Sequence, residues 1–592
     1  MKTKAANFSA NMHDVDYRRR YETVRMTSRS LMCIDGRDME SLDGRWNFTV
    51  DPYETCLRSR WFDEVYESAD GRQLPVDFDF DRGGTMDVPS CWNMARPELF
   101  YYENMGVYSR TFRYERRRDD ERLFLHFEGV AYRAYVFLNG VQVAMHDGAS
   151  TPFSVEITDS VRRDNRLVVA VDASRSDRRV PMSNTDWFNY GGIYRSVYLV
   201  RTPAVFIRDF FIRLVPDSTF SHVALDFSVD GCGQGSAHLA LRELGLEEDV
   251  VFSGGQGHAV FDVKPELWSP AGPKLYDVSL SVGDDEVHDR VGFREIRVEG
   301  MRILLNGEDV FLKGISVHED DIELGKTTTE ESIRRTIRLV KDDLHGVFIR
   351  LAHYPHSRLF SRIADEMGVL LWEEVPVYWA IAFDDDDTLA DARNQLEELV
   401  LRDRNRASVI VWSVGNENPD TDERLAFMGA LAARAREMDG TRCISAACLV
   451  NEAELRIEDR LSSVLDIIGL NEYYGWYKPD FSELGRLIDN SAPDRPVVIS
   501  ECGADARYGN HGTIDMKWTE EAQAEVYRRQ VDEISRTEYI RGMTPWILYD
   551  FRAPRRQNIW QEGFNRKGLV DSDRVHRKMA FDVLAGFYES II

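Results

Sequence analysis

The pattern of the sequence changes once, near residue 300, and this change constrains the fold more than any other feature. Before that point, short β-branched and aromatic runs alternate with Gly, Asp and Asn, as in antiparallel sheets. After it, apolar runs of strand length alternate with helical stretches, which is typical of βα units. We therefore expect all-β domains followed by one α/β domain.

The part before residue 300 divides into two strand-rich regions with a boundary near 205. Asn139-Gly140 joins two of the strand candidates and predicts a tight hairpin, because both central residues of a type I′ turn need a positive φ. We expect an antiparallel sandwich over 1–205 and an immunoglobulin-like sandwich over 206–300. The second lacks the Cys and Trp pattern of antibody domains. The clearest strand candidates in the first region are Leu123 to Phe127, Tyr132 to Leu138, Arg166 to Val171 and Ile193 to Val200.

The part after residue 300 contains eight apolar strand candidates, which predict a closed (β/α)8 barrel over 301–592. They are Val310 to Ser316, Val347 to Leu351, Val369 to Trp372, Val409 to Val414, Cys443 to Ala447, Ile467 to Leu470, Val497 to Ser500 and Thr544 to Leu548. The clearest helix is predicted to begin with a Thr328-x-x-Glu331 capping box. Its apolar stripe consists of Ile333, Ile337, Val340 and Leu344.

The charge and cysteine content exclude several classes of protein. The formal net charge is -27, from 101 acidic and 74 basic residues, so nucleic acid and anionic membranes are not expected as partners. We find neither a secretion signal nor a membrane span in the sequence, and we expect a cytoplasmic protein. The seven cysteines form no C-x-x-C pair and His353 has no second ligand at metal-binding spacing, so we expect reduced thiols, no metal and no organic cofactor.

Two glutamates that end apolar strand candidates stand out as catalytic residues. Glu417 follows the fourth strand and Glu501 follows the seventh, and both ends would meet at the catalytic face of a barrel. A retaining glycosidase needs such a pair, roughly 5 to 5.5 Å apart, with one nucleophile and one general acid that later becomes the base. The alternative interpretation is that strand-end glutamates only cap helices or pair with arginine. Glu374, after the third strand, is a rival carboxylate that we expect to orient Arg350 or a tyrosine.

Several long motifs resemble those of glycoside hydrolase family 2. VIVWSVGNEN resembles the acid/base signature of that family and VVISECGADA resembles its nucleophile strand. Further similar runs are GRWNF at 44–48, VPSCWN at 88–93, NYGGIYR at 189–195, LLNGEDVFLKGISVHED at 304–320 and RLAHYPHS at 350–357. The resemblance implies a jelly-roll sandwich, an immunoglobulin-like sandwich and a catalytic barrel. It implies that Glu417 is the acid/base, that Glu501 is the nucleophile, and that Asn416 binds the sugar 2-hydroxyl.

A second group of residues indicates the sugar. Asn565-x-Lys567 resembles the N-x-K element with which β-glucuronidases of this family hold the C6 carboxylate, and Tyr477 is placed to reach the same group. An ammonium aimed at a carboxylate makes a charge-assisted bond, which a neutral sugar cannot offer. The alternative is a surface lysine in a loop. The remaining candidate binding residues are Arg350, His353, Asn471, Tyr473 and Trp546.

Some positions depart from the family pattern and leave the substrate open. Gln561 stands where glucuronidases often have an arginine, and Arg552, Arg555 and Arg556 are possible substitutes. Glu156 is the expected sandwich-domain acid for the sugar's 4-hydroxyl, so β-galacturonide remains an alternative to β-glucuronide. Further alternatives are a β-galactosidase and a binding protein without chemistry. The short segment from Val377 to Gln395 leaves room for a bulky or extended aglycone, and we expect a homo-oligomer with a small-molecule or oligosaccharide β-uronide as substrate.

Overall fold

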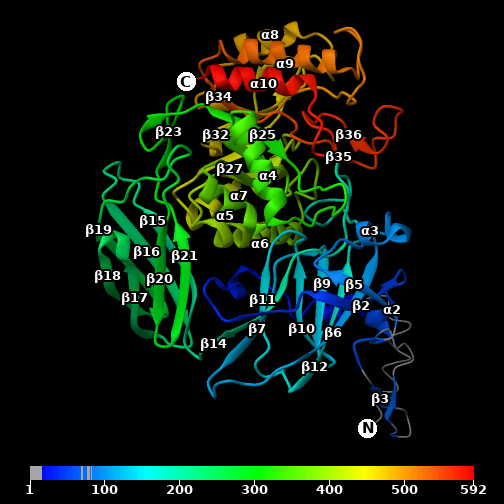
Figure 1. The fold of residues 1–592 in the computed structure, drawn as a ribbon, viewed down its shortest axis with the longest axis vertical. Helices are drawn as coiled ribbons and strands as arrows, with labels where there is room; N and C mark the ends of the chain where they lie inside the picture. Colours follow the sequence, from blue (N-terminus) through cyan, green and yellow to red (C-terminus); the bar gives the residue numbers. More distant parts are fainter. Residues whose placement is uncertain are drawn as a thin grey trace.

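The computed structural model describes residues 17–63, 65–67, 71, 73–75, 81 and 83–591. The first sixteen residues, where a leader would lie, are outside this description. Two β-sandwiches lie next to each other on one side of a barrel, and helices α8, Ser482–Asn490, α9, Glu520–Ile534, and α10, Met579–Ser590, lie on the opposite side (Figure 1). The predicted architecture of two sandwiches and a barrel is therefore confirmed.

The first sandwich consists of a six-stranded and a four-stranded antiparallel sheet around one core. Asn139 and Gly140 both have a positive φ, of 52° and 82°, so the predicted hairpin between β9 and β10 is confirmed. The strands of the two sheets are β1, Met39–Ser41, β2, Gly44–Asp51, β5, Gly84–Val88, β6, Met105–Arg113, β7, Arg122–Phe127, β9, Arg133–Leu138, β10, Val141–Asp147, β11, Phe153–Glu156, β12, Asp164–Asp172, and β14, Val197–Thr202. Shorter elements are α2, Thr55–Arg58, β3, Val65–Glu67, β4, Gln73–Pro75, α3, Trp92–Ala95, β8, Val130–Ala131, and β13, Gly192–Ile193.

The second sandwich is built from seven antiparallel strands that enclose their own apolar core. Side chains alternate between buried and exposed along β21, as expected for a sheet with one solvated face. The strands are β15, Phe206–Leu214, β16, His222–Asp230, β17, Gln234–Leu241, β18, Leu246–Ser253, β19, Gln256–Asp262, β20, Tyr276–Val282, and β21, Asp285–Val291. A small sheet leads from it into the barrel and consists of β22, Ile296–Glu299, β23, Arg302–Leu305, and β24, Glu308–Asp309.

Eight parallel strands close into the barrel, and most of them are buried along their whole length because helices or loops cover the outside. They are β25, Leu312–Val317, β26, Phe348–Leu351, β27, Leu370–Glu374, β28, Val409–Asn416, β29, Cys443–Cys448, β32, Ile467–Asn471, β33, Val497–Glu501, and β34, Ile540–Met543. The outer helices are α4, Glu330–Arg338, α5, Arg358–Met367, α6, Asp386–Asp403, and α7, Asp422–Met438, together with α8, α9 and α10. The hairpin of β30, Val450–Asn451, and β31, Arg456–Ile457, follows β29, and β35, Phe551–Arg552, pairs with β36, Phe564–Asn565.

Two local predictions in the barrel were wrong. The eighth strand is Ile540–Met543, which pairs with β33 and β25, and not Thr544 to Leu548. Pro545 lies in the predicted run and has no N–H to donate to a central strand. Helix α4 is capped one residue later than predicted, because the Thr329 side chain accepts from Ser332 N and the Ser332 hydroxyl accepts from Thr329 N. Its apolar stripe is buried as predicted.

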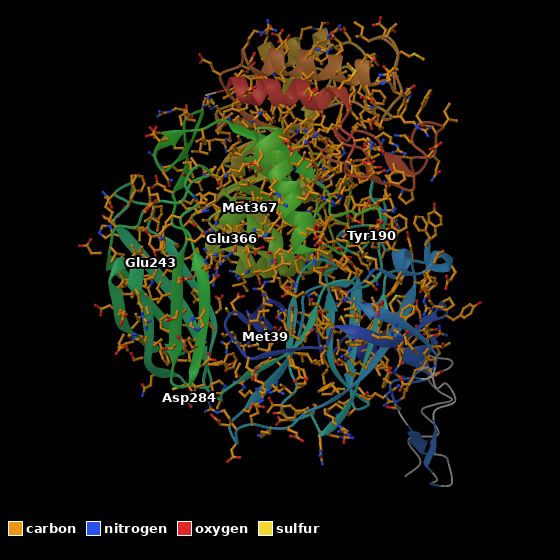
Figure 2. The ribbon with its side chains drawn as sticks, viewed as in Figure 1. Met39, Tyr190, Glu243, Asp284, Glu366 and Met367 are labelled. Carbon is orange, nitrogen blue, oxygen red and sulfur yellow. The ribbon has the colours of Figure 1, made fainter. Side chains whose placement is uncertain are left out.

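The first sandwich is joined to the barrel by buried polar contacts. Tyr190 lies at this boundary (Figure 2), where its hydroxyl donates to Asp320 Oδ1 at 2.7 Å. His146 of the sandwich and Glu398 of α6 form a pair that is fully buried.

Within the described ranges, no helix combines the length and the apolar content that a membrane span requires.

Candidate active site

A cavity of about 510 Å³ opens at the carboxyl ends of the barrel strands. Most of its lining comes from loops that follow the strands, and part comes from the first sandwich. Its lining residues are Asp186, His353, Tyr378, Trp379, Glu417, Tyr473, Tyr477, Glu501, Trp546, Arg555, Arg556, Gln561, Asn565 and Lys567. Both predicted catalytic glutamates therefore face the same cavity.

Glu501 is the last residue of β33 and is held as a hydrogen-bond acceptor. Arg350 Nη1 donates to Glu501 Oε1 at 2.8 Å and the Tyr473 hydroxyl donates to Oε2 at 2.7 Å. Burial and the negative charge of Glu501 raise the pKa of Tyr473 well above its usual value, so this hydroxyl keeps its proton. A carboxylate whose two oxygens are held by a cation and a phenol is oriented to act as a nucleophile.

Glu417 directly follows β28, where its φ of 52° turns the chain out of the strand. Trp379 Nε1 donates to Glu417 Oε2 at 2.7 Å, and Asn471 Nδ2 donates to Oε1 at 3.0 Å. Burial, followed by the charge of Glu501, raises the pKa of Glu417 above its usual value, although both hydrogen bonds oppose this. A carboxyl group whose pKa is raised beside a second carboxyl group is suited to general acid catalysis.

Glu374 has the orienting role that we expected of it. Arg350 donates to both of its oxygens, at 3.0 and 3.2 Å, and His353 Nδ1 lies 2.8 Å from Oε1. Burial acts to raise the pKa of Glu374, but the charge of Arg350 and the bond from His353 outweigh it and lower the pKa to about 2. Glu374 is therefore a fixed anion that orients Arg350, which in turn contacts Glu501.

Asn416 and Asn471 complete the floor between the two glutamates. Asn416 Oδ1 accepts from Arg350 at 2.8 Å and from Asn471 at 3.1 Å. The other side-chain atom, Asn416 Nδ2, is buried and has no hydrogen-bond partner in the part of the chain that the structure describes. Such an unsatisfied donor is costly unless a ligand supplies an acceptor.

Lys567 lines the cavity, but its charge is already paired. Its ammonium donates to Asp505 Oδ2 at 2.6 Å and to the Tyr477 hydroxyl at 2.8 Å, and both members of the ion pair are buried. Burial acts to raise the pKa of Asp505, but the charge of Lys567 lowers it. The expectation that a neutral sugar would leave this cation unpaired was therefore wrong, because Asp505 supplies the counterion. Gln561 also faces this pair, 3.4 Å from Asp505 Oδ1.

The first sandwich contributes Asp186 and Trp187 to the barrel mouth. Asp186 accepts from Arg556 at 2.6 and 3.0 Å and from Asn565 Nδ2 at 3.3 Å. Trp187 stacks on His353, with their ring centroids 5.6 Å apart. A loop from one domain thus closes the site of another.

Of the other expected site residues, Glu156 and Arg552 lie outside the cavity, whereas Trp546 lines it. Glu156 ends β11 on the sandwich surface, where Arg122 holds both of its oxygens at 2.6 and 2.9 Å, so it does not line the cavity. Arg552 also points away and bonds Asp320 Oδ1 at 3.1 Å. Trp546 lies after β34 and stacks on His353 at 4.8 Å, on the cavity wall.

Asp186, Trp379 and Asp505 belong to the site but were not predicted from the sequence. Asp505 could have been found, because it comes four residues after Glu501 and hence follows the same strand. Asp186 and Trp379 lie in loops without periodicity, and only the folded chain brings them to the cavity.

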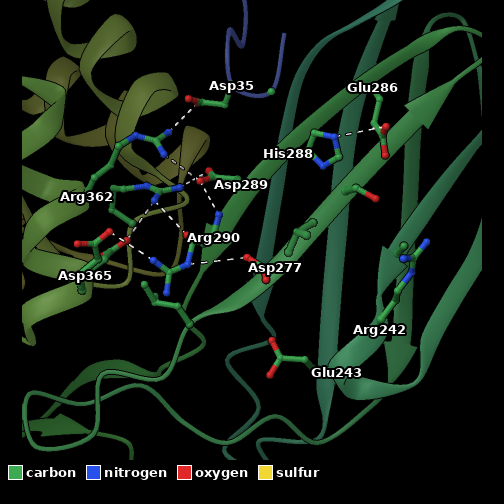
Figure 3. Close-up of a pocket in the computed structure, with 17 residues that line it drawn as sticks. Asp35, Arg242, Glu243, Asp277, Glu286, His288, Asp289, Arg290, Arg362 and Asp365 are labelled. Atoms are coloured by element: carbon green, nitrogen blue, oxygen red, sulfur yellow. Dashed lines mark hydrogen bonds and ion pairs between the residues drawn. The ribbon is translucent and has the colours of Figure 1, made fainter.

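A second cavity, of about 610 Å³, lies where the second sandwich meets the barrel (Figure 3). Its cations are already paired with acids from other elements. Arg362 bonds Asp35 at 2.6 Å and Asp289 at 3.1 Å, and Arg290 lies 3.3 Å from Glu366. We interpret these pairs as domain contacts. In the described ranges we find no group of three or more acidic, histidine or cysteine side chains that could hold a metal ion.

Paired glutamates at the mouth of a (β/α)8 barrel, supported by a ring of donors, define the chain as a glycoside hydrolase of the barrel type. Matches to three family domains specify the family of glycoside hydrolases. Residues 39–203, 205–294 and 296–589 match, in order, the sugar binding domain of glycosyl hydrolases family 2, a further domain of glycosyl hydrolases family 2, and its TIM barrel domain. The chain belongs to glycoside hydrolase family 2.

Its relatives include uronidases of two kinds. A β-glucuronidase of Paenibacillus borealis is 27% identical over 590 residues, covering 91% of this chain and 95% of that protein. A β-galacturonidase of Eisenbergiella tayi, solved with galacturonate, superposes with a TM-score of 0.80 at 25% identity, over 95% of this chain and 98% of that one. A β-glucuronidase of Ruminococcus gnavus, solved with D-glucuronic acid, also gives a TM-score of 0.80 at 25% identity, over 95% of this chain and 100% of that one.

Proposed function

We propose that this protein is a retaining exo-β-glucuronidase that removes a terminal β-D-glucuronic acid through a covalent glycosyl-enzyme. The observation that carries this proposal is the position of Lys567 and Asn565 in the same cavity as Glu417 and Glu501. The β-glucuronidase relatives support it.

In the first step, a Glu501 oxygen attacks the anomeric carbon while the bond to the leaving oxygen breaks and Glu417 gives that oxygen its proton. Glu501 thereby loses its negative charge, which removes the second of the two effects that raise the pKa of Glu417, while the larger effect, burial, remains. In the second step, Glu417 takes a proton from water, the water oxygen attacks the anomeric carbon, and the ester to Glu501 breaks. The free Asn416 Nδ2 is available to the sugar's 2-hydroxyl.

The side of the cavity that carries Lys567, Asn565 and Tyr477 is suited to bind the C6 carboxylate of a uronic acid. The lining cations are Arg555, Arg556 and Lys567, whereas Asp186 and the adjacent Asp505 are the acids that offset them. The Lys567 ammonium and the Arg556 guanidinium bring charged donors to this wall although each is paired with an acid, and the Asn565 amide and Tyr477 hydroxyl add neutral donors for the C6 carboxylate.

The experiment compares kcat/KM on 4-nitrophenyl β-D-glucuronide, β-D-galacturonide, β-D-galactoside and β-D-glucoside. We expect the glucuronide to be the best substrate, and Glu501→Gln to be inactive on all four. The variant Lys567→Gln should lose about two to four orders of magnitude on uronides, since an ammonium paired with a desolvated carboxylate is worth about 3 to 5 kcal/mol. The neutral glycosides should be unchanged.

Lys567→Gln also leaves Asp505 buried without its counterion, so we expect this single variant to have a lower Tm than the wild-type protein. The double variant Lys567→Gln/Asp505→Asn removes both charges and serves as the matched control. If the double variant lost activity equally on uronides and neutral sugars, Lys567 would be structural and the substrate assignment would be wrong.

β-Galacturonide hydrolysis is the second candidate. It is favoured by Gln561 in place of an arginine and by the match to the β-galacturonidase structure. The sandwich acid that we propose for the 4-hydroxyl is Asp186 instead of Glu156, since Asp186 lines the cavity. The same substrate panel separates the two sugars.

We propose a homo-oligomer as the assembled form, which light scattering of the purified protein tests.

A further inference from the structure

We propose that Arg555 recognises an anionic group on the leaving-group side of the cavity, so that the preferred substrates are β-uronides whose aglycone carries a carboxylate. This inference rests on the proposed function and concerns the part of the substrate that is released.

The position of Glu417 locates the leaving group. A general acid must lie within hydrogen-bond reach of the oxygen that it protonates, so the aglycone leaves next to Glu417. Trp379 donates to Glu417 Oε2 at 2.7 Å and therefore lies on this side of the cavity. The guanidinium of Arg555 lies over the Trp379 ring, 5.1 Å from its centroid.

Arg555 and Arg556 are adjacent in sequence but face different parts of the site. Ala553 O accepts from Arg556 N at 2.9 Å, which closes a turn, and the two side chains diverge from it. Arg556 bonds Asp186 and, at 3.2 Å, the Tyr477 hydroxyl on the wall proposed for the sugar carboxylate. Arg555 instead donates to Asn184 Oδ1 at 3.1 Å and covers Trp379.

The charge of Arg555 is not compensated. Of the three cations lining the cavity, Arg556 is paired with Asp186 and Lys567 with Asp505. In the described chain, no carboxylate forms an ion pair with Arg555, whose guanidinium instead donates to the neutral Asn184 amide. Its guanidinium is exposed and is held in place by an aromatic ring. An arginine fork presented in this way matches a carboxylate, which it can bind through two parallel bonds.

The test uses two pairs of substrates that differ only in charge. The aryl pair is 4-carboxyphenyl and 4-carbamoylphenyl β-D-glucuronide. The sugar pair is a β-glucuronosyl disaccharide whose second sugar is a uronic acid, and its C6 amide. The wild-type protein is compared with Arg555→Gln, with the charge-conserving Arg555→Lys, and with Arg110→Gln. Arg110 also lies over a tryptophan, 5.9 Å from the Trp46 centroid, but outside the cavity.

We expect the wild-type kcat/KM to favour the acidic member of a pair by about threefold to tenfold at low salt, as for a partly exposed charge pair. Arg555→Gln should abolish this preference, Arg555→Lys should keep part of it, and Arg110→Gln should keep all of it. A preference for the acidic member of the sugar pair alone identifies the natural anion as an acidic sugar, and a preference in the aryl pair alone identifies it as an aryl acid.

Two results would overturn the inference: no preference for either acidic member in the wild-type protein, or a preference that survives in Arg555→Gln. Failure of the proposed function is distinguishable, because 4-nitrophenyl β-D-glucuronide would then not be hydrolysed at all.

Discussion

Glu417 is the residue whose protonation state decides whether the first chemical step proceeds. Burial and the charge of Glu501 raise its pKa, whereas the N–H groups of Asn471 and Trp379 stabilise the ionised form. The site therefore balances two demands. The acid must be protonated before the first step, and its conjugate base must be stable enough to form during that step.

Replacing Trp379 with phenylalanine should shift this balance in a known direction. The variant removes a donor to the Glu417 carboxylate, so the pKa of Glu417 should rise further. Since the general acid then stays protonated to higher pH, the alkaline limb of the kcat/KM profile should move upward. The measurement is kcat/KM against pH for both proteins. A limb that stays in place or moves to lower pH would contradict the assignment of Glu417 as the acid.

At the residue scale, the sequence predicts the positions that follow strands and misses those that depend on long loops. Glu417, Glu501 and Arg350 could be placed at one face because a closed barrel brings all its strand ends together. Asp186 could not, because its place depends on how the first sandwich docks. The prediction for Glu156 was wrong because it rested on the resemblance to the family's sandwich domain, and the fold places Glu156 on the sandwich surface against Arg122.

At the scale of elements, the segment after β25 joins two domains, and its residues are not among those that line the cavity. Glu319 accepts from Arg195 at 2.8 Å, Asp320 accepts from Tyr190, and Lys326 donates to Ser150 at 2.8 Å. Each of these bonds crosses from the barrel to the first sandwich. Domain docking therefore explains Glu319 and Asp320 at the end of the family-like motif at 304–320, whereas most of the motif forms β23, β24 and β25.

Breaking one of these bonds should be costly. Arg195→Met leaves the Glu319 carboxylate buried without its cation, which should cost about 3 to 5 kcal/mol and lower Tm. The control is Arg334→Met, which removes surface pairs with Glu330 on α4 and Glu366 on α5 and should cost about 1 kcal/mol or less. Thermal and urea unfolding measure both variants. Equal losses would mean that the Arg195 pair contributes no more than a surface pair.

The elements themselves follow from simple patterns, and the errors have identifiable causes. Seven of the eight barrel strands overlap their predicted runs, since buried parallel strands are continuous apolar segments. The eighth prediction instead covered the apolar loop around Trp546, which packs against His318 and Phe551 beneath the cavity. An apolar run can line a core without being a strand, and no period in the sequence distinguishes the two cases.

At the scale of the whole molecule, the active site belongs to two domains. The loop of the first sandwich places Asp186 against Arg556 and Trp187 against His353, while Tyr190, four residues after Asp186, bonds Asp320 outside the cavity. One loop therefore carries both a cavity residue and a docking residue. This arrangement allows the catalytic and the structural contributions of the sandwich to be separated.

Asp186→Asn and Tyr190→Phe form the matched pair for this purpose. Asp186→Asn keeps the shape of the side chain but removes a charge that faces the cavity, so kcat/KM on the preferred uronide should fall by about tenfold to a hundredfold, the usual value of a hydrogen bond to a charged group. Tyr190→Phe removes a buried docking bond of 2.7 Å and should lower Tm while leaving kcat/KM unchanged. Kinetics and thermal unfolding on the same preparations compare the two. If both variants lowered Tm and neither changed kcat/KM, the sandwich would serve only to support the barrel, and the site would belong to the barrel alone.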